Sequence, residues 1–291
     1  MIERAKAILL EVLKEDDKNS EVHHTLASIY LEQGDHDRAI EHGKKAVKLN
    51  KSVADYHLLL AHSYGLKAMN SGMLGKFACA KNCKREYETT IELDSSNVEA
   101  RLGLMQYCLM APGIAGGDED EAVRQAEIIQ SLDSLSGAYA WASIWQERED
   151  FEKAESALRQ AVALDTSSTY DARFGLGYFF QQRERYAEAE STFQEILRLN
   201  PDDMRAVYQL GKTYLLAKRN LQEAERCFRQ YLQVAPVRYA PSWAAAHWRL
   251  GMVFDAQGKR DDALMQLRKA VEMDHDSEQF RKTLEEVEKG E

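Results

Sequence analysis

Residues 170–203 read YDARFGLGYFFQQRERYAEAESTFQEILRLNPDD, and most of the chain repeats the pattern of this stretch. A first set of marker positions has the i, i+3, i+4, i+7 spacing of one helix face. A second set follows a polar turn over residues 182–185 and marks one face of another helix, which Pro201 ends. The two sets are Arg173, Leu176, Gly177 and Phe180, and then Ala189, Phe193 and Ile196. The stretch predicts a helical hairpin, which needs stacked copies to bury its apolar face.

Further copies of this hairpin can be followed along the sequence. Together they predict seven repeats, approximately over residues 20–53, 54–97, 98–134, 135–168, 170–203, 204–238 and 244–275. Residues 1–19 match only the second helix of the pattern, so we expect an N-terminal helix that is half a repeat. Residues 276–291 predict a C-terminal capping helix with a charged outer face. The chain is therefore expected to be all-α.

The composition argues against several classes of protein. A formal net charge of −10 argues against nucleic acid as the main partner, because phosphate binding needs a basic surface. The sequence has no run of about eighteen apolar residues, so membrane insertion is not expected. The start, Met1-Ile2-Glu3-Arg4, lacks the basic and apolar regions of a signal peptide, which predicts a cytoplasmic protein. A periplasmic or exported location stays open if a signal peptide was removed.

The cysteines do not predict redox chemistry or a disulfide framework. They are few and scattered, and we expect them to be buried as small apolar side chains. The four are Cys79, Cys83, Cys108 and Cys227. No cofactor is expected.

The Leu-Gly-x2-Tyr/Phe…Ala-x3-Phe/Leu pattern resembles the tetratricopeptide repeat over about residues 20–275, and repeats five and six carry every anchor. The resemblance implies a right-handed α-solenoid superhelix whose first helices line a concave groove. Two shorter stretches, residues 64–68 (YGLKA) and 109–117 (LMAPGIAGG), resemble segments of little-characterised bacterial tetratricopeptide repeat proteins, many of them exported.

Repeats two and three depart most from the pattern. Repeat two contains roughly ten extra residues, which predict a projecting hairpin with a bend near Ser71–Gly72. It is the most basic part of the chain, and either a solvated helix face or a docking site would explain its cations. They are Lys67, Lys76, Lys81, Lys84 and Arg85. Repeat three has a glycine-rich loop over residues 111–117, but the Gly-Lys-Ser/Thr sequence of a phosphate site is missing.

Helical phase predicts which side chains face a ligand, because the stacking positions and the groove positions lie on different faces of each first helix. Repeats four to seven place five aromatic residues on the groove side: Tyr139, Phe174, Tyr178, Tyr208 and Trp248. Exposed aromatic rings suit the capture of a peptide or helix, since they bury a large area with little loss of entropy. Several rings could instead lean onto the neighbouring helix as peripheral core. Arg205 and Lys212 would pair with an acidic group on the ligand.

No motif predicts an enzyme, since neither a Ser/His/Asp set nor an HExxH sequence is present. His24, His62 and Asp55 lie on the groove side of the first two repeats and are of the types that bind zinc or nickel. Chance clustering of polar groove residues is the simpler interpretation. A metal-dependent activity at His24 and His62 is therefore the least favoured alternative.

The sequence thus predicts a non-catalytic scaffold for protein–protein interaction that binds a peptide or partner helix in its concave groove. The alternative is an assembly module of a larger complex, or a self-associating protein. It would use the N-terminal half repeat and the basic hairpin of repeat two.

Overall fold

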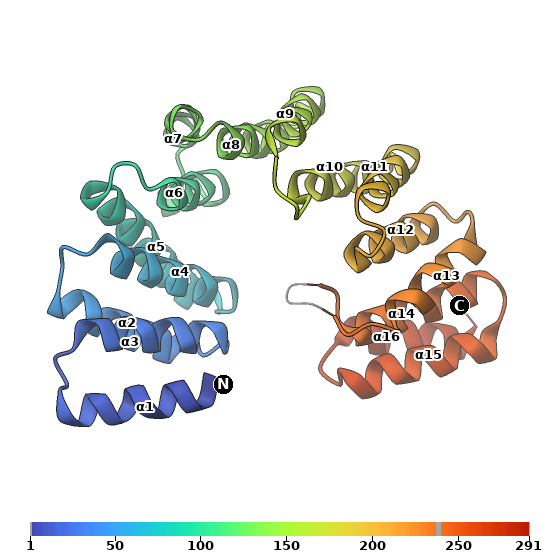
Figure 1. The fold of residues 1–291 in the computed structure, drawn as a ribbon, viewed down its shortest axis with the longest axis horizontal. Coiled ribbons are helices and arrows are strands. Elements are labelled where there is room, and N and C mark those ends of the chain that lie inside the picture. The colour runs from blue at the N-terminus through green and yellow to red at the C-terminus, as the bar shows by residue number, and fades with distance from the viewer. Residues whose placement is uncertain (1, 237–239, 291) are drawn as a thin grey trace. The chain divides into compact units, whose positions relative to one another are not determined.

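The computed structural model describes residues 2–236 and 240–290, except for the side chains of Met73, Leu74 and Ile114. Within these residues the chain is all-α, with 16 α-helices, one short 3-10 helix and no strand (Figure 1). This confirms the predicted fold class, and the number of helices roughly fits the predicted repeats. No helix of the described chain is both long enough and apolar enough to cross a membrane. The chain divides into two compact units, residues 1–157 and 158–291.

Unit 1 begins with a single helix and continues as hairpins. Its helices are α1 (Ile2–Glu15), α2 (Ser20–Glu32), α3 (His36–Leu49), α4 (Ala54–Met69), α5 (Met73–Leu93), α6 (Val98–Met110), α7 (Glu119–Leu132) and α8 (Ser134–Glu147), with η1 (Gly113–Ala115) between α6 and α7. Each hairpin packs on the next through contacts of α3 with α4, of α5 with α6 and of α7 with α8. The division between the units falls within α9 (Phe151–Leu164).

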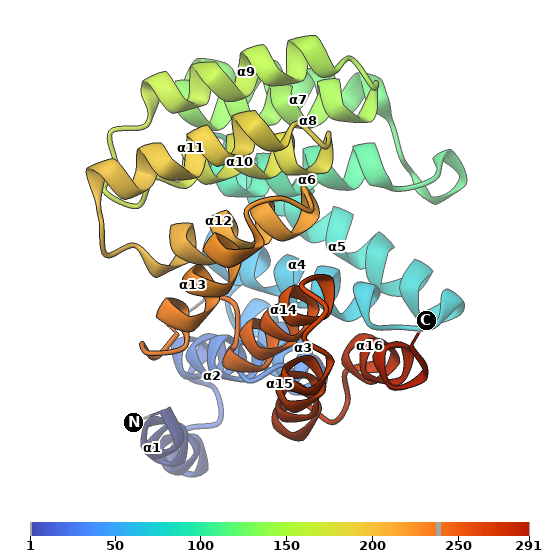
Figure 2. The same cartoon turned by 90° about the vertical axis from the view of Figure 1, so that its right-hand side faces the viewer.

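Unit 2 contains three hairpins and a terminal helix, which Figure 2 shows from a second direction. Its helices after α9 are α10 (Asp171–Gln182), α11 (Tyr186–Leu199), α12 (Met204–Leu216), α13 (Leu221–Tyr231), α14 (Trp243–Ala256), α15 (Arg260–Met273) and α16 (Glu278–Lys289). Phe193, Phe228 and Leu267 are fully buried at equivalent positions of the three second helices. Helix α16 buries Phe280 and Val287 against the end of the stack and exposes charged residues.

Small residues let the paired helices approach closely. A Cβ atom added to Gly177 would lie 2.5 Å from the Phe193 ring, and one added to Gly103 would lie 2.3 Å from the Tyr87 ring. These distances are far below van der Waals contact, so the aromatic rings occupy the space that a larger residue would need. Gly177 of the Leu-Gly pair therefore sets the spacing between α10 and α11 within one hairpin, whereas Gly103 sets the spacing between α5 and α6 of neighbouring hairpins.

The turn inside each hairpin uses a left-handed residue. Gly34 and Gly258 occupy this position with φ near +75°, and other repeats place Glu149, Glu184 and Lys218 there with φ between 48° and 56°. Glycine adopts this conformation without strain, whereas a residue with a Cβ atom pays a conformational cost. Five hairpins thus share one turn geometry despite different turn residues.

The two irregular repeats also have ordered local structure. Helices α4 and α5 turn at Asn70–Gly72, which confirms the predicted bend. The glycine-rich loop packs on unit 1, because the Lys84 ammonium donates to the Gly116 carbonyl at 3.0 Å and the Tyr107 hydroxyl donates to the Ala115 carbonyl. A Cβ atom on Gly117 would lie 1.8 Å from the Ala111 carbonyl oxygen. Gly117 therefore serves the close packing of this loop.

All four cysteines are free and buried, as the sequence predicts. Burial raises the pKa of the Cys83 thiol to about 12 and the pKa values of the Cys108 and Cys227 thiols to about 11. These side chains therefore stay protonated at neutral pH.

Candidate functional site

Six of the seven predicted binding residues lie in unit 2, on its three first helices. We call the surface formed by α10, α12 and α14 the first-helix face. Phe174 and Tyr178 come from α10, Arg205, Tyr208 and Lys212 from α12, and Trp248 from α14. Tyr139 lies on α8 in unit 1, where it is half-buried. The site is therefore described within unit 2.

Three of the predicted aromatic residues are not exposed. Phe174, Tyr208 and Trp248 are at most 5% exposed, so the alternative interpretation as peripheral core is correct for these three rings. The rings lean onto the second helix of their own hairpin or onto the capping helix. Their partners are Phe193 for Phe174, Phe228 and Tyr231 for Tyr208, and Phe280 for Trp248, with ring centroids 5.1–6.1 Å apart.

Trp248 is held most firmly, because its polar atom also has a partner. The indole Nε1–H donates to the Thr283 hydroxyl of α16 at 3.0 Å, while the ring packs on Phe280. Buried tryptophan usually satisfies its N–H group in this way. The tryptophan therefore fixes α16 to α14 and contributes to the closure of the stack.

Among the predicted aromatic residues of the first-helix face, Tyr178 is the accessible one, with 39% of its surface exposed. One side of its ring rests against Phe174 and Phe193, at centroid distances of 6.1 Å each. Partial burial raises the pKa of its hydroxyl. Tyr178 therefore stays neutral at physiological pH and offers both a ring surface and a hydrogen-bonding group.

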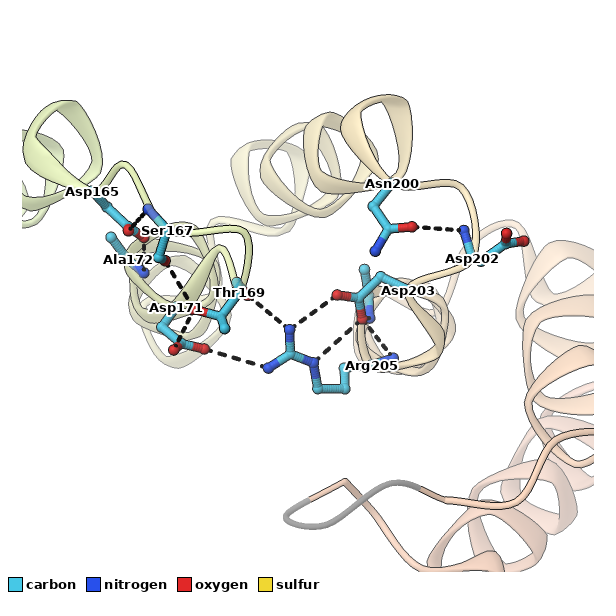
Figure 3. Close-up of polar contacts among 10 residues, drawn as sticks. Asp165, Ser167, Thr169, Asp171, Ala172, Asn200, Asp202, Asp203 and Arg205 are labelled. Atoms are coloured by element: carbon cyan, nitrogen blue, oxygen red, sulfur yellow. Dashed lines mark hydrogen bonds and ion pairs between the residues drawn. The ribbon is translucent and has the colours of Figure 1, made fainter.

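Arg205 is engaged within the protein (Figure 3). Its guanidinium pairs with the carboxylate of Asp203 at 3.0 Å and with that of Asp171 at 3.3 Å. It also donates to the Thr169 carbonyl at 2.7 Å and lies 4.5 Å from the centre of the Phe174 ring. Asp203 in turn accepts from the backbone N–H groups of residues 205 and 206 at the start of α12. Arg205 thus joins the starts of α10 and α12.

Lys212, unlike Arg205, is not neutralised by acidic side chains of the described residues. It is half-buried and makes no hydrogen bond or ion pair with any residue that the structure describes. Burial and the nearby charge of Arg249 lower the pKa of its ammonium group. A partly desolvated cation without a carboxylate is unusual in a chain of net charge −10.

Arg249 of α14 is the second such cation, and it is absent from the residues predicted from the sequence. Its guanidinium lies 4.1 Å from the centre of the Trp248 ring and 3.8 Å from the sulfur of Met252. No carboxylate of the described residues pairs with it, and its buried Nε–H has no partner. The signal in the sequence was that Arg249 is the only cation of α14, in a helix of mostly apolar residues.

Two buried amide oxygens of α10 and α12, those of Gln181 and Gln209, have no hydrogen-bond partner among the described residues. The amide nitrogen of Gln181 donates to the Gln209 carbonyl and to the Thr213 hydroxyl at 3.2 and 2.8 Å. Unpaired buried polar atoms are uncommon in native proteins. The first-helix face therefore has unused hydrogen-bonding capacity where α10 meets α12.

The histidines considered as metal ligands do not converge. His24 stacks on Tyr56 at 4.9 Å, whereas His62 lies 3.7 Å from Glu99 and packs edge-on against Tyr87. No group of three histidine, cysteine, aspartate or glutamate side chains within the described ranges could hold a metal ion.

Tetratricopeptide repeat family models match residues 1–63 and, in overlapping segments, residues 139–278. No curated protein matches the chain. A tetratricopeptide repeat protein from Parabacteroides merdae is structurally similar, with 15% identity, coverage of 92% of this chain and 98% of the other, and a TM-score of 0.58. A thermophilic protein of the same class from Thermus thermophilus has 16% identity, coverage of 67% and 99%, and a TM-score of 0.52.

A chain of the APC/C hetero-tetramer Cut9–Hcn1 also matches, with 16% identity and a TM-score of 0.54. The alignment covers 99% of this chain and 52% of the other. At these identities the structural matches show the fold alone. The family models and the hairpin architecture together show that the chain belongs to the tetratricopeptide repeat family, whose members in general are scaffolds for protein interaction.

Proposed function

We propose that the chain is a non-catalytic scaffold that binds an extended peptide or a partner helix on the first-helix face of unit 2. The observation that carries this proposal is the pair of half-buried cations, Lys212 and Arg249, that lack acidic partners. Holding two like charges close together in a partly desolvated site is unfavourable. A carboxylate on the ligand would relieve this cost.

The contacts define the chemistry of the ligand. Its carboxylate would lie between Lys212 and Arg249, and an adjacent apolar side chain would contact Tyr178 and Met252. Arg205 does not take the acidic group that the sequence suggested for it, because Asp171 and Asp203 already neutralise its charge. The ligand is therefore an acidic segment with at least one large apolar residue.

The state of the cysteines argues against one kind of catalysis, that by a cysteine nucleophile. Thiolate is the nucleophilic form of cysteine, and burial holds the pKa values of three thiols at about 11 or above.

A displayed library of random peptides, selected on the immobilised full-length protein, tests the proposal. We expect enrichment of acidic, apolar-containing peptides, because only they satisfy both parts of the site. Selection of no peptide at all would overturn the scaffold proposal. Selection of peptides without acidic residues would support peptide binding but would refute the role of the two cations.

The selected peptides are then measured against two sets of variants. Lys212→Gln with Arg249→Gln, and separately Tyr178→Ala, should each weaken binding at least tenfold. Arg198→Gln with Lys269→Gln makes the same change in charge at exposed positions of α11 and α15 and should leave binding unchanged. Phe174 and Tyr208 are unsuitable targets, because truncation of a buried aromatic residue costs about 3–5 kcal/mol of stability.

The alternative function, an assembly module, is supported by α1. None of its residues is buried, and Ile2, Ile8, Leu10 and Val12 are exposed. Exposed apolar residues concentrated on one helix are typical of an interaction surface. In this alternative, α1 packs against a second copy of the chain or against a subunit of a larger complex.

A further inference from the structure

The free end of the α4–α5 hairpin has an unusual composition. Residues 56–85 contain no aspartate or glutamate, although the chain has 48 of them. The same segment contains four lysines and one arginine. A stretch of this length without an acid gives one local region of positive charge in an acidic protein.

The end of this hairpin also exposes large apolar side chains. Leu66 and Met69 close α4 with 40% and 77% exposure, and Phe77 in the first turns of α5 is 42% exposed. At 1.5 Å per residue, these side chains lie within about 6 Å of the ends of the two helices. Figure 2 shows the turn between α4 and α5 at an edge of unit 1.

The cations around this end differ in their availability. Lys67 pairs with Asp37, Lys84 binds the Gly116 carbonyl, and Arg85 pairs with Glu86. Lys76 and Lys81 are exposed and make no ion pair with the described residues. We define the hairpin tip as Leu66, Met69, Lys76, Phe77 and Lys81.

We propose that the hairpin tip docks on an anionic lipid surface. The apolar side chains enter the boundary between headgroups and acyl chains, whose depth of about 5–10 Å matches the height of the apolar group. The flexible side chains of Lys76 and Lys81 extend to the headgroups and contact lipid phosphates. The chain binds the membrane peripherally through this tip.

The composition of the tip favours a lipid surface over an acidic protein. Lysine is depleted in protein–protein interfaces, where arginine is the preferred cation. Lysine side chains suit a membrane interface, because their flexible stems cover apolar atoms while the ammonium groups reach the headgroups. The acids elsewhere on the chain weaken the attraction little at moderate salt, since the screening length is about 10 Å.

Flotation of the full-length protein with vesicles tests the proposal. We expect binding to vesicles of phosphatidylcholine mixed with phosphatidylglycerol, much weaker binding to phosphatidylcholine alone, and release as salt is raised. Failure to bind the mixed vesicles at moderate salt would overturn the proposal.

Two variants and two controls separate the contributions of charge and apolar contact. Lys76→Glu with Lys81→Glu, and Met69→Ser with Phe77→Ser, should each reduce the bound fraction at least fivefold. Lys48→Glu with Lys51→Glu makes the same change in charge elsewhere in unit 1, and Met265→Ser with Met273→Ser removes exposed apolar side chains from α15. Both controls should bind like the wild type.

Two further outcomes would contradict docking of the hairpin tip on lipid. Loss of binding in the controls as strong as in the tip variants would show general charge attraction and refute docking through the tip. Vesicle binding that depends on Lys76 and Lys81 but not on Met69 and Phe77 would be a purely electrostatic contact, without the proposed entry of the apolar side chains into the membrane. That result would also overturn the lipid proposal.

Discussion

At the scale of single residues, buried histidines distinguish unit 1. The Nδ1 atoms of His23 and His42 lie 2.9 Å apart within a buried pair, so one ring donates to the other. Burial, and then the charge of His23, lowers the pKa of His42 to about 4. The hydrogen bond requires at least one of these Nδ1 atoms to be unprotonated.

This pair makes the stability of unit 1 depend on pH. Because the pKa of His42 is lower in the folded state than its unfolded value near 6.5, the contribution is fully present above about pH 6.5 and is lost as the pH falls towards 4. We expect a loss on the order of 2–3 kcal/mol over this interval. Urea unfolding at several pH values measures it.

The matched variant for this prediction is His42→Gln, which cannot take up a proton. Between pH 6.5 and 4, the free energy of unfolding of the variant should depend less on pH than that of the wild type. The part of the pH dependence that comes from the acidic residues of the chain should remain. An identical pH profile for the wild type and His42→Gln would contradict the assignment.

At the scale of the element, the turn of each hairpin stores a small amount of strain. Lys218 adopts a left-handed conformation with φ of 48° at the position where Gly34 and Gly258 stand in other repeats. Lys218→Gly should therefore stabilise unit 2 by about 0.5–1 kcal/mol, since relief of strain outweighs the entropy of glycine. Chemical denaturation measures the change.

The neighbouring residue supplies the control. Ala217 has a right-handed conformation with φ of −71°, so Ala217→Gly should destabilise the unit by about 0.5–1 kcal/mol. The same sign of change in both variants would show that flexibility, and not turn geometry, governs this position.

At the scale of the whole molecule, the fold could be predicted from the sequence because the apolar residues of each helix recur with helical spacing. In repeats five to seven the Leu-Gly pair and the bulky residue that packs on its glycine recur at fixed spacing, and each of these contacts lies within a single hairpin. Phe193, Phe228 and Leu267, all fully buried, illustrate this local determination.

The candidate site was less predictable, because it depends on distances between side chains. Helical phase places Phe174, Tyr208 and Trp248 on the groove side but does not reveal that their long side chains reach the next helix. The partners of Arg205 come from the loop at Thr169 and from Asp203, outside any helical period. Arg249 lies one position beyond the groove positions that the phase selected.

Self-association is a property of the whole molecule, and α1 gives a prediction for it. If α1 binds a second copy, the apparent mass in light scattering should rise with protein concentration. Ile8→Lys should abolish the rise, because Ile8 is the most exposed large apolar residue of α1. Met273→Lys, at an exposed site of α15, should not. A constant monomer mass at every concentration would exclude this form of the assembly alternative.

The course of α9 has a consequence for how such a protein can be recombined. The division between the compact units falls after Ala157, yet the buried residues Ala154, Leu158 and Ala161 continue across it on one helix. A genetic junction placed at that division would give each product a helix fragment of about two turns, too short to persist alone. Junctions in the loops after Leu164 or Leu199 keep every helix whole. The natural cassette for duplication or exchange is therefore the single hairpin, and not the compact half of the molecule.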